Sequence, residues 1–231
     1  MTRPTRIAIS LAVLGSAVAA GAAFAASVPI YSNAMSSSGD RSDLVRSGAG
    51  KCMRGAGAQA LQVTVGKRTL ECQLRTPVIG GNVEIKATAR LLSGTPEEMQ
   101  RRVFVAVSVR DGGEGRYQLA VFPAKGTFQL RRDLPPDGAR TLLAKGDASS
   151  VKAVGKPNKL RLQAFPTAAG QTRVTAYVNG RNVASVLEDA HTSSTVTGRL
   201  TTFSVGSAKA AKGAKASFDD LSVAVPDPFQ G

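Results

Sequence analysis

The residues that could carry covalent chemistry are few and poorly grouped. His191 is the single histidine of the 231 residues, and the nucleophile motif G-x-S-x-G does not occur. A serine-hydrolase triad therefore has no pattern to support it. The stretch GAGKC, residues 48–52, lacks both the first glycine and the final Ser or Thr of a phosphate-binding loop. Neither pattern predicts an enzyme.

The two cysteines offer a different kind of chemistry. Cys52 and Cys72 are the only ones in the chain and are 20 positions apart. In an oxidising compartment they most simply form one disulfide, and the alternative is two buried free thiols. With a single histidine available, they cannot complete a four-ligand zinc site. We therefore predict a disulfide, no metal ligands and no cofactor.

The beginning of the chain carries the pattern of an export signal. Arg3 and Arg6 precede an apolar, alanine-rich stretch, and Ala23-Phe24-Ala25 forms an A-x-A cleavage site. This pattern predicts that residues 1–25 are a signal peptide. Residues 7–26 are also long enough to span a bilayer, so a membrane anchor is the alternative. Either way, we expect the rest of the chain to be secreted or held at the cell surface.

Beyond residue 55 the sequence predicts strands. Residues 26–54, rich in Ser, Gly and Ala, are interpreted as a loosely ordered linker or edge segment. In VEIKATARL, residues 83–91, apolar and polar residues alternate, as in a strand with one solvated face. RVFVAVSVR, residues 102–110, is apolar on nearly both faces, which suits a covered strand.

Turn signals separate these strands. Asn179-Gly180 lies between two alternating arms and predicts a tight hairpin in which both turn residues have positive φ. TPEEMQR, residues 95–101, is the one segment expected to form a helical turn, with Thr95 as its N-cap. Short strands broken by Gly and Pro favour an all-β fold, an antiparallel sandwich or barrel.

Four C-terminal segments narrow this choice to one fold. PNKLRLQAF, VTAYVNGRNVASVLED, TGRLTTFSVGS and ASFDDLSV follow one another, and the hairpin GRYQLAVFPAKGTFQLRRD precedes them. This order resembles the concanavalin A-like lectin/glucanase superfamily, and its laminin-G-like members in particular. The resemblance covers residues 80–226 and implies a jelly roll, an antiparallel two-sheet β-sandwich, which we assign to residues 55–228. Such motifs mark a fold and do not identify an activity.

The resemblance also implies a test for catalysis. Glycosidases of this superfamily carry acid and base carboxylates two and four positions apart on one strand. No two of the 16 Asp and Glu residues are two positions apart. The adjacent pair Asp219-Asp220 would point to opposite faces of a strand and supplies only two of the six to eight oxygens that calcium needs. We therefore predict no catalytic residue, although a pair assembled from different strands stays open.

The remaining signal is positive charge. The formal net charge is +14, and a basic exterior attracts anionic polymers unless salt screens it; the alternative is an ordinary solvated surface. Aromatic residues make up only 5% of the chain, with no Trp, so nucleic acid is not an expected partner. The candidate ligand contacts are two tyrosines on strands and nearby arginines: Tyr117, Tyr177, Arg116, Arg131, Arg161 and Arg173.

Together these features predict an exported, non-catalytic, lectin-like module. Its expected ligand is a glycan of the cell envelope or the extracellular space, including anionic polymers. Membrane attachment would occur through residues 7–26. Two alternatives remain open at this stage: a glycoside hydrolase of the same fold, and a structural or protein-interaction scaffold at the cell surface.

Overall fold

The computed structural model describes residues 27–37, 44–47, 52–56, 60–67, 69–79, 83–110, 115–134, 139–189, 200–207, 209 and 211–226. The expected signal peptide or anchor and His191 lie outside these residues. Within the part of the chain that is described, no helix is long and apolar enough to cross a bilayer.

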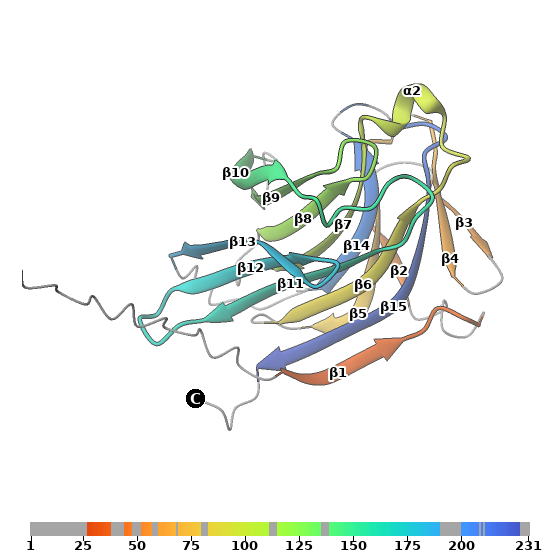
Figure 1. Ribbon diagram of the computed structural model, residues 1–231. Coiled ribbons are helices and arrows are strands. Elements are labelled where there is room, and N and C mark those ends of the chain that lie inside the picture. Colours follow the sequence, from red (N-terminus) through yellow and green to blue (C-terminus); the bar gives the residue numbers. More distant parts are fainter. Residues whose placement is uncertain are drawn as a thin grey trace, which may run out of the picture.

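The chain forms two antiparallel sheets that pack face to face (Figure 1). Sheet A has eight strands, in the order β13-β12-β11-β6-β15-β4-β3, with β1 also paired to β15. They are β1 (Ser27–Asn33), β3 (Cys52–Ala56), β4 (Leu61–Val65), β6 (Glu84–Leu91), β11 (Asn158–Pro166), β12 (Thr172–Val178), β13 (Arg181–Glu188) and β15 (Lys215–Pro226). The predicted all-β sandwich is confirmed.

Sheet B has seven strands, in the order β10-β9-β8-β7-β14-β5-β2. They are β2 (Val45–Ser47), β5 (Glu71–Ile79), β7 (Val103–Arg110), β8 (Arg116–Phe122), β9 (Thr127–Leu134), β10 (Ala139–Asp147) and β14 (Leu200–Ser207). β2 and β3 lie at one edge of their sheets and β1 pairs along β15, so the segment expected as a linker supplies strands to the sandwich.

The space between the sheets holds one hydrophobic core. Along β12, Val174, Ala176 and Val178 are fully buried in it, as their alternation with polar residues predicts. Facing side chains from sheet B include Val105 and Leu119. Because each strand gives one face to this core, its other residues lie on the outer face of the sheet.

The Asn179-Gly180 hairpin has the predicted geometry. Both residues have positive φ, 52° and 83°, which Asn and Gly tolerate better than other residues. The side chain of Asn179 accepts a hydrogen bond from the backbone N–H of Lys159 at 2.9 Å and donates one to the carbonyl of Ser150 at 2.6 Å. The turn is therefore tied to β11 and to the loop before it.

The expected helical turn is present as α2 (Glu97–Gln100), but the predicted N-cap is wrong. Pro96 occupies the N-cap position and makes no side-chain cap bond. The hydroxyl of Thr95 instead bonds both the N–H and the carbonyl of Lys215, at 2.9 and 3.1 Å. The Thr95 hydroxyl thus bonds the backbone of β15, and it does not cap the helix as the sequence pattern predicts.

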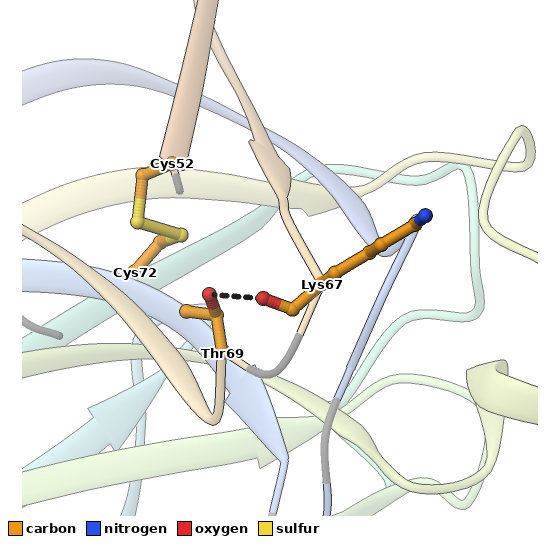
Figure 2. The surroundings of a disulfide bond; sticks show 4 residues. All are labelled: Cys52, Lys67, Thr69 and Cys72. Carbon is orange, nitrogen blue, oxygen red and sulfur yellow. Dashed lines mark hydrogen bonds between the residues drawn. A yellow bond between two sulfur atoms is a disulfide. The ribbon is translucent and has the colours of Figure 1, made fainter. Parts of the chain in front are cut away.

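The two cysteines form the predicted disulfide (Figure 2). Cys52 is the first residue of β3 in sheet A and Cys72 lies in β5 of sheet B, with their Cα atoms 5.7 Å apart. In the turn before β5, the hydroxyl of Thr69 donates to the carbonyl of Lys67 at 3.3 Å. The covalent bond therefore joins the two layers of the sandwich near one edge.

Candidate functional site

The outer face of sheet B carries a band of charged and amide side chains. In β8, Tyr117 and Leu119 belong to the core, so the alternating residues Arg116 and Gln118 lie on the opposite face. The same alternation in β9, where Leu130 is in the core, places Arg131 and Asp133 on that outer face.

These side chains, together with one from β5, form what we call the arginine–carboxylate cluster: Glu71, Arg116, Gln118, Arg131 and Asp133. Arg116 joins the two acids, with Nη2 at 3.0 Å from Glu71 Oε2 and 2.8 Å from Asp133 Oδ2. Gln118 donates from Nε2 to Glu71 Oε1 at 2.8 Å and accepts a hydrogen bond from Arg131. The cluster is therefore a continuous network across three strands.

A glycine makes room for this network. Gly206 of β14 is paired with both Glu71 and Phe104 on its neighbouring strands. A Cβ at this position would lie 2.8 Å from the carbonyl oxygen of Leu70 and 2.9 Å from the ring of Phe104. The ring of Phe104 supports the guanidinium of Arg131, whose Cζ is 4.8 Å from the ring centroid, a cation–π geometry.

Glu71 is held in its ionised form by its neighbours. Burial alone would raise the pKa of Glu71, but Arg116, a hydrogen bond with Ser204 and Arg131 together lower it below its ordinary value. The pKa of Arg116 is raised, since the attraction of Glu71 and Asp133 outweighs its burial. Glu71 and Arg116 are thus both charged at neutral pH.

Positive charge nevertheless exceeds negative charge here. Arg140 of β10 adds a third guanidinium, 3.6 Å from Asp133 Oδ1, whereas the cluster has two carboxylates, those of Glu71 and Asp133. Burial lowers the pKa of Arg131, and repulsion from Arg140 and Arg116 adds to this effect, although Asp133 and Glu71 oppose it. Arg131 Nε and Asp133 Oδ1 lie 3.6 Å apart, as an ion pair too long for a hydrogen bond, and neither atom has a hydrogen-bond partner among the described residues. Because three guanidinium groups face two carboxylates, the cluster carries a net positive charge, which favours an anionic ligand group.

The lowered pKa of Glu71 predicts acid sensitivity. Its folded-state pKa lies below the ordinary 4.5, as does that of Glu84 in sheet A. The stabilisation from both groups is therefore complete above about pH 4.5 and is lost as the pH falls through their folded-state values. Thermal unfolding followed by circular dichroism should give a constant melting temperature from pH 7 to pH 5.5 and a falling one below pH 4.5.

A matched variant checks the origin of that loss. The double variant Glu71→Gln/Glu84→Gln should melt lower at pH 7, but its melting temperature should depend less on pH between 5 and 3. An acid response as steep as that of the unmodified protein would show that other carboxyl groups cause it.

The carboxylates of Glu71 and Asp133 are close enough together to be compared with the catalytic pair of a glycosidase. Their oxygens lie at most about 6 Å apart, because one Arg116 nitrogen is 3.0 Å from the first and 2.8 Å from the second, near the separation of a retaining pair. Such a pair needs one protonated carboxyl as acid. The arginine between them and the lowered pKa of Glu71 favour charge over proton donation. The described residues contain no group of three potential metal ligands.

The six residues expected to contact ligand do not share one surface. Arg116 and Arg131 are in the cluster of sheet B. Tyr117, by contrast, has no exposed surface and packs inside the core. Arg161 and Tyr177 line a groove on the outer face of sheet A, and the Arg161 guanidinium carbon is 4.7 Å from the Tyr177 ring centroid. Arg173 is exposed on β12 and is not part of that groove.

Sequence reasoning missed Glu71, Gln118 and Asp133. One signal was available: Arg116 and Gln118, like Arg131 and Asp133, are two positions apart on strands and so share a face. Nothing in the sequence indicates that Glu71 joins them, because β5 meets this face only through β14.

No family model matches the sequence, and a comparison with curated proteins finds no match. Solved structures do resemble it. Carbohydrate binding module CBM66 from Bacillus subtilis is 14% identical, covers 79% of this chain and 95% of its own, and has a TM-score of 0.54. A Bacillus subtilis protein of unknown function with a galectin-like fold is 14% identical, covers 87% of this chain and 100% of its own, and has a TM-score of 0.59.

An enzyme shows the same architecture. The GlcNAcα1-4Gal-releasing endo-β-galactosidase from Clostridium perfringens is 10% identical, covers 87% of this chain and 63% of its own, and has a TM-score of 0.62. At these identities the comparison concerns the fold alone. The two stacked sheets and these likenesses show that the chain has a jelly-roll fold, which it shares with a carbohydrate-binding module and with a glycan-cleaving enzyme.

Proposed function

We propose that this protein is an exported, non-catalytic module that binds anionic glycans through the arginine–carboxylate cluster of sheet B. The observation that carries the proposal is the excess of three guanidinium groups, of Arg116, Arg131 and Arg140, over two carboxylates on this face. Burial and the other two guanidinium groups lower the pKa of Arg131. A carboxylate or sulfate on a sugar would offset that charge and accept hydrogen bonds from the guanidinium. An alginate lyase with a TM-score of 0.51 has the same fold.

Export is supported by two features. Residues 1–25 carry the n-region, apolar stretch and A-x-A site of a signal peptide. The disulfide between Cys52 and Cys72 is typical of oxidising compartments. The module would meet its ligand at the cell surface or outside the cell.

The contacts of the two carboxylates argue against hydrolysis for a chemical reason. Both carboxylates of the cluster bond the same arginine, and the pKa of Glu71 is lowered. Neither property suits a general acid, whose pKa must lie near the working pH. The closeness of the two acids nevertheless makes hydrolysis the second candidate, and the same experiment tests both.

The test uses a polygalacturonate column and the variant Arg131→Met. The unmodified protein should be retained at about 20 mM NaCl and released by about 500 mM, because salt screens the long-range attraction between the basic protein and the polyanion. Removing a charged hydrogen-bond donor should weaken binding to an oligogalacturonate at least roughly tenfold. The variant should still fold, because Asp133 keeps Arg116 and Arg140 as partners.

Three results would count against the proposal. Absence of retention at low salt would remove anionic glycans as ligands. Unchanged affinity of Arg131→Met would remove the cluster as the site. Release of new reducing ends from the polysaccharide, lost in Glu71→Gln, would replace binding by hydrolysis. Lys212→Glu, which changes an exposed lysine in the turn before β15, serves as the control for net charge.

A further inference from the structure

A groove crosses the outer face of sheet A, on the side of the sandwich opposite to the cluster. It has a volume of about 300 Å³ and is lined by residues of β6, β11, β12 and β15, strands that lie side by side in Figure 1. This volume is at the lower end of small-molecule sites. The residues used below are Lys86, Thr88, Lys159, Arg161, Tyr177 and Asp220.

A buried carboxylate fixes two cations beside this groove. Glu84 is only 1% exposed, and its Oε1 is 2.5 Å from Lys86 Nζ. Its Oε2 accepts hydrogen bonds from Arg161 Nε and Gln163 Nε2, each at 2.6 Å. Because Glu84 holds both cationic side chains in place, a ligand that binds them loses little side-chain freedom.

Arg161 keeps donors available for such a ligand. Its Nε bonds Glu84 and its guanidinium lies over the Tyr177 ring, which leaves its two terminal amino groups without a partner among the described residues. Lys86 and Arg161 together carry one more charge than Glu84 can neutralise, and Lys159 adds another at the groove wall. This end of the groove suits a carboxylate.

The other side of the groove suits hydroxyl groups. A register shift in β15 interrupts the ladder between Asp219 and Ser222, and Asp220 has a positive φ of 48°. There Asp220 Oδ2 accepts a hydrogen bond from Thr88 at 3.2 Å. Its other oxygen remains available as an acceptor for a sugar hydroxyl, since a carboxylate has about four lone-pair sites.

We propose that this groove is a second glycan site, which takes one uronic acid unit with its carboxylate at Arg161 and Lys86 and its hydroxyls at Asp220. The site rests on its own contacts and does not require the cluster of sheet B to bind ligand. If both sites bind, one module holds two polymer strands on opposite faces. The protein would then cross-link an acidic polysaccharide and not merely coat it.

Titration calorimetry with tetragalacturonate tests this proposal. The unmodified protein should bind two molecules of tetragalacturonate. The variants Lys159→Glu and Arg131→Met should each bind one molecule, and the variant that carries both substitutions should bind none. Lys159→Glu reverses a charge at the groove and should weaken the binding of tetragalacturonate to the groove at least roughly tenfold. Lys86→Met is a second groove variant, and Glu84 would retain Arg161 and Gln163. Lys212→Glu again controls for net charge.

The outcomes separate the two sites. A stoichiometry of one that Arg131→Met abolishes and Lys159→Glu leaves unchanged would overturn the second site alone. A stoichiometry of one with the opposite dependence would overturn the cluster and support the groove. Displacement by free sulfate at matched ionic strength, or equal binding of neutral maltotetraose, would overturn the assignment to a uronic acid unit.

Discussion

Replacing Arg116 by methionine is expected to lower the free energy of unfolding by about 3–5 kcal/mol, the range found when one partner of a buried ion pair is removed. Arg116 is the only described group that bonds both Glu71 and Asp133 directly, and the three side chains are largely buried. The variant would leave Glu71 charged with only Gln118 and Ser204 as close partners. Urea unfolding at pH 7, monitored by circular dichroism, measures the loss.

Two companion variants show whether the loss comes from uncompensated charge. Adding Glu71→Gln to Arg116→Met should recover part of the stability, because the buried negative charge is then absent. Arg140→Gln should cost less than about 1 kcal/mol, since that side chain is 42% exposed and 3.6 Å from its partner. A loss below 1 kcal/mol for Arg116→Met would mean that water solvates the cluster in solution.

Removing the disulfide should have the next largest effect. The variant Cys52→Ala/Cys72→Ala is expected to lower the free energy of unfolding by about 3 kcal/mol, because the bond no longer restricts the unfolded chain. The bond closes a loop of sequence separation 20 and joins β3 of sheet A to β5 of sheet B. Urea unfolding with and without a reducing agent measures the difference.

The reducing agent provides the control. It should destabilise the unmodified protein by the same amount as the double substitution and should leave the variant unchanged. If the unmodified protein unfolds identically with and without reducing agent, the two thiols are not joined in solution. If the variant loses affinity for tetragalacturonate while still folded, the bond also positions Glu71, which precedes Cys72 in β5.

Local sequence patterns predict much of the fold. The alternation in β6 and β12 fixed which residues enter the core, and Asn179-Gly180 fixed a hairpin, because both features depend on neighbours along the chain. The motif order over residues 80–226 indicated the jelly roll. Strands β1, β2 and β3 are harder to predict, since their composition is typical of loops. In addition, β1 pairs with β15 and β2 with β5, strands that do not follow them in the chain, whereas β3 pairs with the next strand, β4.

The candidate sites depended on information that the sequence does not contain. Alternation put Arg116, Arg131, Arg161 and Tyr177 on strands, but two sheets have two outer faces, and a periodic pattern does not say which strand belongs to which sheet. The choice of Tyr117 as a ligand contact was wrong, because its ring lies in the core with Leu119, two positions along the same strand. The carboxylates that pair with Arg116 and Arg161, those of Glu71 and Glu84, come from strands far away in sequence.

The sequence by itself determined the local geometry: strands with a solvated face, a hairpin, one helical turn and two cysteines able to pair. Only the tertiary structure decided which charges meet. Burial and Coulomb attraction act through space and across strands, so the surplus charge at Arg131 and the cation pair around Glu84 exist only once the two sheets have assembled.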